Sequence, residues 1–121
     1  MSDWNSHVIN IAAELKQFLD RNNEFMIINI GDVYMQFLLK NDCVVFEAVG
    51  PKNLDNCPIA VDWLVEHGWE LPTLKFSNNF HRHLKLPFDV NEVANIVVTT
   101  FSHGYGLTAD MKITINEETE E

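Results

Sequence analysis

Residues 25–49 read FMIINIGDVYMQFLLKNDCVVFEAV, and this stretch decides the fold. Three runs rich in apolar, aromatic and β-branched residues are separated by Gly31-Asp32 and Asn41-Asp42, dipeptides that favour tight hairpin turns. Because such turns join neighbouring strands, we expect an antiparallel meander. Its strands are predicted at Phe25–Ile30, Val33–Leu39 and Cys43–Val49.

The second strand separates an apolar face from a mixed one, because successive side chains of a strand point to opposite sides. The apolar face carries Val33, Met35, Phe37 and Leu39. The mixed face carries Tyr34, Gln36 and Leu38, to which the third strand adds Val45 and Glu47. We expect helices on the apolar face and a partner on the mixed face, since large apolar patches are rarely left exposed without a use.

Segments with helical periodicity flank the meander. Apolar residues recur at helical spacing from Asp3 to Asp20 and again after Asp89, which stands three residues before Glu92 as in a capping box. The other predicted elements are a short helix from Pro58 to His67 closed by Gly68, a strand within Leu74–Leu86, and a last strand at Met111–Ile115.

Strands and helices are segregated along the chain, which is typical of α+β folds. We therefore predict an antiparallel sheet built on the three-stranded meander and packed by the N-terminal and C-terminal helices, with the two long helices sharing one face. One domain is expected over residues 1–116, followed by an acidic disordered tail over residues 117–121.

The charge of the chain excludes some functions and favours others. The 121 residues include 18 acidic and 8 basic side chains, for a formal net charge of −10. Nucleic-acid binding is not expected, because it requires clusters of Lys and Arg. A basic protein partner is favoured, because opposite charge accelerates association.

The expected location is the cytoplasm. No apolar run approaches the roughly 20 residues of a membrane span. A secretory signal is not expected either, because the pattern of a basic start followed by an apolar stretch is not seen. Two cysteines, Cys43 and Cys57, are too few for a disulfide scaffold and are read as reduced thiols.

Catalytic and metal sites are not expected. His81 and His83 share one face of a predicted strand, as in some zinc sites, but no further ligand stands at a recognisable spacing. They are interpreted as solvent-facing histidines. Neither cysteine has a setting that would activate it as a nucleophile. The chain is therefore predicted to be no enzyme and to need no cofactor.

Acidic residues gather around the predicted short helix, where they are interpreted either as a solvated face or as a docking surface for a cationic partner. They are Asp55, Asp62, Glu66 and Glu70. Trp63 and Trp69 stand among them, and aromatic residues often anchor protein interfaces.

Three short motifs carry a family resemblance. Residues 64–72 read LVEHGWELP, Asn79-Phe80 follows, and the last predicted helix ends in Gly104 to Leu107. Over roughly residues 24–110 this order resembles the type III secretion chaperone-like (TY-Chap) domains. The chain departs from that family at His81-Arg82-His83, where a tryptophan commonly follows the Asn-Phe.

The resemblance implies a non-catalytic α+β domain that binds peptides or proteins. The expected function is that of an immunity protein, which neutralises a cognate basic, nuclease-type bacterial toxin. The alternative is a secretion chaperone that binds an effector segment and forms a homodimer. The candidate partner-binding residues are Asp55, Asp62, Trp63, Glu66, Glu70, Tyr34, Gln36 and Glu47.

Overall fold

A computed structural model describes residues 4–21, 24–40, 43–50, 59–72 and 79–118. The helices are α1 (Asn5–Asp20), α2 (Val61–Glu66), α3 (Val90–Thr99) and the π-helical turn η2 (Thr100–Gly104) that continues α3. The strands are β1 (Phe25–Ile30), β2 (Val33–Leu39), β3 (Cys43–Ala48), β4 (Phe80–Lys85) and β5 (Thr114–Glu118).

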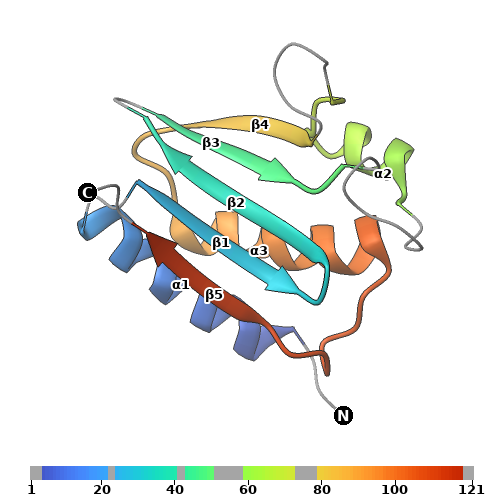
Figure 1. The fold of residues 1–121 in the computed structure, drawn as a ribbon, viewed down its shortest axis with the longest axis horizontal. Helices are drawn as coiled ribbons and strands as arrows, with labels where there is room; N and C mark the ends of the chain where they lie inside the picture. Colours follow the sequence, from blue (N-terminus) through green and yellow to red (C-terminus); the bar gives the residue numbers. More distant parts are fainter. Residues whose placement is uncertain (1–3, 22–23, 41–42, 51–58, 73–78, 119–121) are drawn as a thin grey trace.

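The five strands form one antiparallel sheet in the order β4-β3-β2-β1-β5, and α1 and α3 lie against one of its faces (Figure 1). The α+β fold, the meander and the shared helix face are therefore confirmed. The core lies between these two layers, where Met35, Phe37 and Phe46 of the sheet are fully buried against Leu15, Phe18 and Phe101 from the helical layer. The apolar face of β2 is the buried face, as the alternation predicts.

The strand bounds of the meander agree closely with the sequence, because hairpin turns are encoded locally. The first two strands have the predicted bounds, and the third ends one residue earlier, at Ala48. Gly31, in the first turn, has φ 58°, a conformation that glycine adopts at little cost.

The prediction of a disordered tail from residue 117 is wrong for its first two residues. Glu117 and Glu118 belong to β5, where they pair with Met26 and Phe25 of β1. The physical reason is that the backbone edge of β1 needs a partner, and Glu117 also lies 3.7 Å from the guanidinium of Arg21. Residues 119–121 lie outside the described residues.

The remaining elements are shifted or shorter than predicted. The last strand starts at Thr114 rather than Met111, and the short helix starts at Val61, while Pro58 lies outside the described residues. Of the strand predicted within Leu74–Leu86, the structure shows β4 at Phe80–Lys85. Residues 73–78 lie outside the described residues.

Two predicted helix caps are confirmed. The side chain of Asp89 accepts hydrogen bonds from the backbone N–H groups of Asn91 and Glu92 at the start of α3. Gly68, after α2, has φ 99°, which a residue with a Cβ atom rarely adopts.

Within the described residues, no helix combines the length and the apolar character that crossing a bilayer demands.

Candidate functional site

Helix α2 exposes apolar side chains that a short helix would normally bury. Of its six residues only Leu64 is buried, while Val61 and Val65 are 37% and 47% exposed. Asp62 and Glu66 are also exposed and, like the two valines, stand one helical turn apart. The helix thus presents an apolar pair beside an acidic pair. We call the exposed side chains of Val61, Asp62, Val65 and Glu66, together with the half-buried Trp63, the α2 surface.

Trp63 stacks against two histidines. Its ring centroid lies 4.0 Å from that of His67 and 5.4 Å from that of His103 in η2, with interplanar angles of 18° and 21°. Nδ1 of His67 lies 2.7 Å from the carbonyl oxygen of Trp63, and because a carbonyl only accepts, Nδ1 carries the hydrogen. The ring of Trp63 is therefore half-buried and held in place by stacking.

The position of α2 depends on the π-helical turn. A Cβ atom on Gly104 would lie 2.9 Å from Cδ2 of Leu64, so the glycine makes room for the buried side chain of α2. The backbone N–H of Ala60 donates to the carbonyl of Gly104 at 2.8 Å. This close packing fixes α2, and with it Trp63, against the π-helical turn that continues α3.

Trp69 is part of the core rather than of the surface. It is 2% exposed, and its Nε1 donates to Oγ1 of the buried Thr100 at 3.2 Å. The guanidinium carbon of Arg82 lies 5.5 Å from the centre of the Trp69 ring. Of the two tryptophans beside the acidic residues, only Trp63 is placed to meet a partner.

Arg82 ties β4 to the end of α2. It belongs to the helix-covered face of the sheet, and its Nη1 donates to the carbonyl of His67 at 3.0 Å. Burial lowers the pKa of Arg82, and the attraction of Glu92 opposes that shift. Because arginine remains charged at any physiological pH, Arg82 holds the end of α2 to β4 over the whole physiological pH range.

The mixed face of the sheet contains a buried polar network. The carboxylate of Glu47, only 6% exposed, accepts hydrogen bonds from Gln36 Nε2 at 3.1 Å and from Asn79 Nδ2 at 3.0 Å. Asn79 also accepts from the backbone N–H of Gly50 and bonds with the hydroxyl of Tyr34. These contacts join β2, β3 and the start of β4. On this face a partner would reach the half-buried Tyr34 and Gln36 before Glu47.

The two strand histidines differ in environment. They lie on one face of β4, as predicted, and their ring centroids are 6.4 Å apart. His83 is exposed, but His81 is only 7% exposed, so the interpretation of both as solvent-facing is wrong for His81. The reason is its place beside Glu70, whose backbone pairs with that of His81 and whose carboxylate lies 3.5 Å from Nε2. Among the described residues, no three His, Cys, Asp or Glu side chains are grouped as metal ligands.

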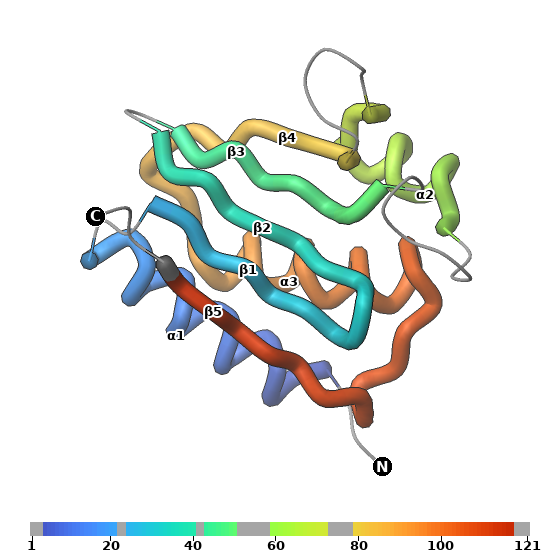
Figure 2. The backbone as a smooth tube through the Cα atoms, viewed as in Figure 1, coloured from blue at the N-terminus to red at the C-terminus, as the bar shows by residue number. Residues whose placement is uncertain are grey.

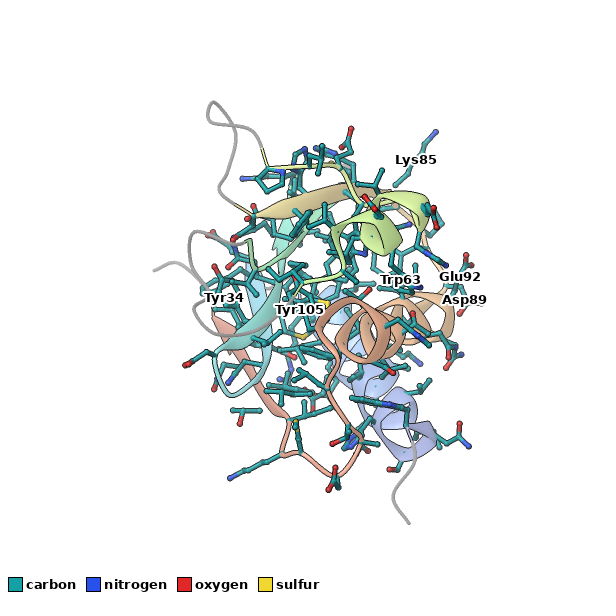
Figure 3. All side chains as sticks on the ribbon, turned by 90° about the vertical axis from the view of Figure 1, so that its right-hand side faces the viewer. Tyr34, Trp63, Lys85, Asp89, Glu92 and Tyr105 are labelled. Atoms are coloured by element: carbon teal, nitrogen blue, oxygen red, sulfur yellow. The ribbon has the colours of Figure 1, made fainter. Side chains whose placement is uncertain are left out.

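The predicted partner-binding residues lie on two surfaces. Figure 3 shows Tyr34 and Trp63 on opposite sides of the sheet, Trp63 on the side of the helices. Tyr34, Gln36 and Glu47 therefore belong to the mixed face, whereas Asp62, Trp63 and Glu66 belong to the α2 surface. Glu70 pairs with His81 at the edge of β4, and its carboxylate lies beside that histidine on the mixed face. Asp55 lies outside the described residues.

Sequence reasoning missed the histidines around Trp63. The spacing of Trp63 and His67 places both on one side of a helix, and this signal was available. No sequence signal brings His103 to Trp63, because that contact depends on the π-helical turn.

A scan against protein-family models, a search of curated proteins and a search of solved structures each found no match to this chain. The resemblance to TY-Chap domains stays a prediction.

Proposed function

We propose that this chain is a non-catalytic, cytoplasmic protein-binding module that recognises a basic protein through the α2 surface. The observation that carries the proposal is the exposure of Val61 and Val65 directly beside Asp62 and Glu66. An exposed apolar pair rimmed by charge is typical of an interface, where apolar contacts supply affinity and charges supply specificity.

The specific function that we propose is that of an immunity protein for a cationic toxin. A net charge of −10 attracts a basic partner from a distance, and the carboxylates of Asp62 and Glu66 then meet it at the contact. An inhibitor of a toxic enzyme must bind quickly, so electrostatic acceleration of encounter is useful. The resemblance to the TY-Chap family supports this proposal independently of the charge.

Trp63 is the proposed anchor of the interface. Its ring is half-buried and stacked against His67 and His103, so it loses little conformational entropy on binding. Tryptophans in such positions commonly dominate interface energies. We expect Trp63→Ala to weaken binding by about 2 kcal/mol or more.

The test uses the protein encoded by the neighbouring gene as the probe. It is expressed in bacteria alone and together with this chain, and growth is measured. Rescue of growth is expected, and the purified pair should associate more slowly as salt rises. Toxicity that this chain does not relieve, or a neighbouring protein that is neither toxic nor bound, would contradict the immunity function.

Charge-matched variants locate the interface. Asp62→Asn with Glu66→Gln should slow association roughly tenfold at low salt. Asp20→Asn with Asp32→Asn removes the same charge from exposed positions on α1 and the first hairpin, so it serves as the control. Equal slowing by both pairs would mean that only the total charge matters and that α2 is not the interface.

A secretion chaperone is the second candidate function. Among the described residues, no helix or strand lies over the sheet face that bears Tyr34 and Gln36 (Figure 1). Such a face could receive an extended effector segment. In that case light scattering should report a homodimer of twice 13.9 kDa, and the protein should bind an unfolded segment. A monomer without affinity for unfolded segments would exclude the chaperone.

A further inference from the structure

A cavity of about 280 Å³ opens between the start of α1 and the start of β5, away from the α2 surface. It is lined by His7, Asn10 and Ile11 from α1 and by Met111, Ile113 and Ile115. Lys112 completes the lining. We propose that this groove binds an extended acidic peptide segment, which adds as a strand to β5, places an aliphatic side chain in the cavity and sets a carboxylate beside Lys112.

The edge of the sheet provides the backbone contacts. Strand β5 is the last strand on its side, and its one partner in the described part of the chain is β1. Figure 2 shows β5 at the end of the sheet, with β1 on its inner side. An edge strand carries N–H and C=O groups that can pair with a further strand. A peptide added there would gain main-chain hydrogen bonds whatever its side chains are.

The cavity provides a place for one side chain. Alternate side chains of an added strand would point to the same side of the sheet as Ile115, which is the side of α1. The cavity lies on that side, between α1 and the residues that lead into β5, and its lining is largely apolar. An apolar cavity of roughly 150 Å³ can hold a benzene-sized ligand, so 280 Å³ is ample for a valine or leucine side chain. Met111, 41% exposed at the rim, extends the apolar contact.

The charge of the lining selects an acidic peptide. The lining includes Lys112 and no carboxylate, although the whole chain has a net charge of −10. Nε2 of His7 cannot accept a hydrogen bond from the peptide, because this nitrogen already donates to the carbonyl of Ala109 at 2.7 Å. Lys112 is the lysine of the lining, and it supplies the positive charge that a carboxylate of the peptide would meet. The preference is opposite to that of the acidic α2 surface, so the two sites would bind different partners.

The experiment uses an array of blocked heptapeptides in which aliphatic, acidic and basic residues are permuted over all positions. The protein should retain peptides that combine Val, Leu or Ile with a neighbouring Asp or Glu. Lys112→Glu should weaken the best peptide about tenfold or more. The matched control is Lys85→Glu, which reverses the charge of an exposed lysine on β4 and should leave binding unchanged.

N-methylated peptides test the strand addition itself. In a strand that pairs along one edge, alternate N–H groups point toward the sheet. Methylation of every second amide can be placed in two phases. Binding should be abolished in the phase whose methylated amides face β5 and preserved in the phase whose methylated amides face away from it.

Retention of basic peptides, retention of no peptide, or equal effects of the two methylation phases would overturn the proposal. The same holds if Lys112→Glu does not alter binding. A dimer that Lys112→Glu dissociates would identify a second copy of the chain as the occupant, and this result would also reject the peptide.

Discussion

At the residue scale, Asn79 is the centre of the buried network on the mixed face. It joins Tyr34, Glu47 and the backbone of Gly50. Asn79→Ala removes a donor from a carboxylate that is only 6% exposed. We expect a loss of about 2–3 kcal/mol in the free energy of unfolding, because a buried charged group is left with fewer partners. Urea titration measures the change.

An exposed asparagine provides the control for this substitution. Asn95 in α3 is exposed, and its side chain donates to the backbone carbonyl of Asn91, one turn before it. Asn95→Ala should change the free energy of unfolding by less than about 0.5 kcal/mol. If the two alanine variants had similar stabilities, Asn79 would not organise the network.

The same residues show where prediction from sequence fails. Alternation along β2 and β3 assigns each side chain to a face, so the placement of Tyr34, Gln36 and Glu47 on one side is predictable. Their burial is not, because Glu47 is covered through Asn79, which lies 32 residues away in the sequence. Similarly, His81 is covered through Glu70. Contacts between distant segments leave no local periodicity from which to infer them.

At the element scale, the junction of α3, η2 and α2 controls the α2 surface. Gly104→Ala would bring a Cβ atom to 2.9 Å from Cδ2 of Leu64. Because Leu64 is fully buried, we expect α2 to shift and stability to fall by about 1–3 kcal/mol. The NMR signal of the Trp63 indole should move, since its stacking on His103 depends on the same junction.

A double-mutant cycle tests the cause of that effect. Leu64→Val shortens the side chain that the new methyl group would meet. If overpacking is the cause, Gly104→Ala should cost at least about 0.5 kcal/mol less in the Leu64→Val background than in the wild type. Additive effects of the two substitutions would attribute the loss to the backbone of η2 instead.

The acidic end of β5 gives a second prediction about an element. Removal of residues 117–121 deletes two positions that pair with Met26 and Phe25, and also the contact between Glu117 and Arg21. The midpoint of urea unfolding should fall, and hydrogen exchange at the start of β1 should accelerate. Removal of residues 119–121 alone leaves β5 complete and is the control. A tail without structure would make the two truncations equally stable.

The elements that the sequence predicts well are those encoded by local signals. The meander follows from two turn dipeptides, and α3 follows from Asp89 and the apolar stripe behind it. Strand β5 is harder to predict, because two of its three side chains past Ile115 are acidic and resemble a solvated tail. Its structure comes from pairing with β1, which lies roughly ninety residues earlier in the sequence.

At the scale of the whole molecule, the fold class is predictable because helices and strands are segregated along the chain, which disfavours a parallel sheet. The candidate site is predictable only in part. The residues around the short helix were identified from charge and aromatic content, and the structure places Asp62, Trp63 and Glu66 on one helix. The groove beside Lys112 was not predicted, because it forms between the two ends of the chain.

The net charge of −10 should give salt two opposite effects. Raising NaCl from about 0.05 to about 0.5 M shortens the Debye length, which weakens repulsion among the carboxylates of the folded chain. The free energy of unfolding should therefore rise by about 0.5 kcal/mol or more. Association with a basic partner should slow over the same range, because the long-range attraction is screened as well.

Urea titrations and stopped-flow association at each salt concentration separate the two effects. In the Asp20→Asn, Asp32→Asn variant the gain in stability should be smaller, because two charges no longer contribute to the repulsion. Its association with the partner should keep most of the salt dependence if the α2 surface is the contact. Stability that falls with salt would show that favourable ion pairs, such as Arg21 with Glu117, outweigh the repulsion. Association indifferent to salt would remove electrostatic attraction from the proposed mechanism.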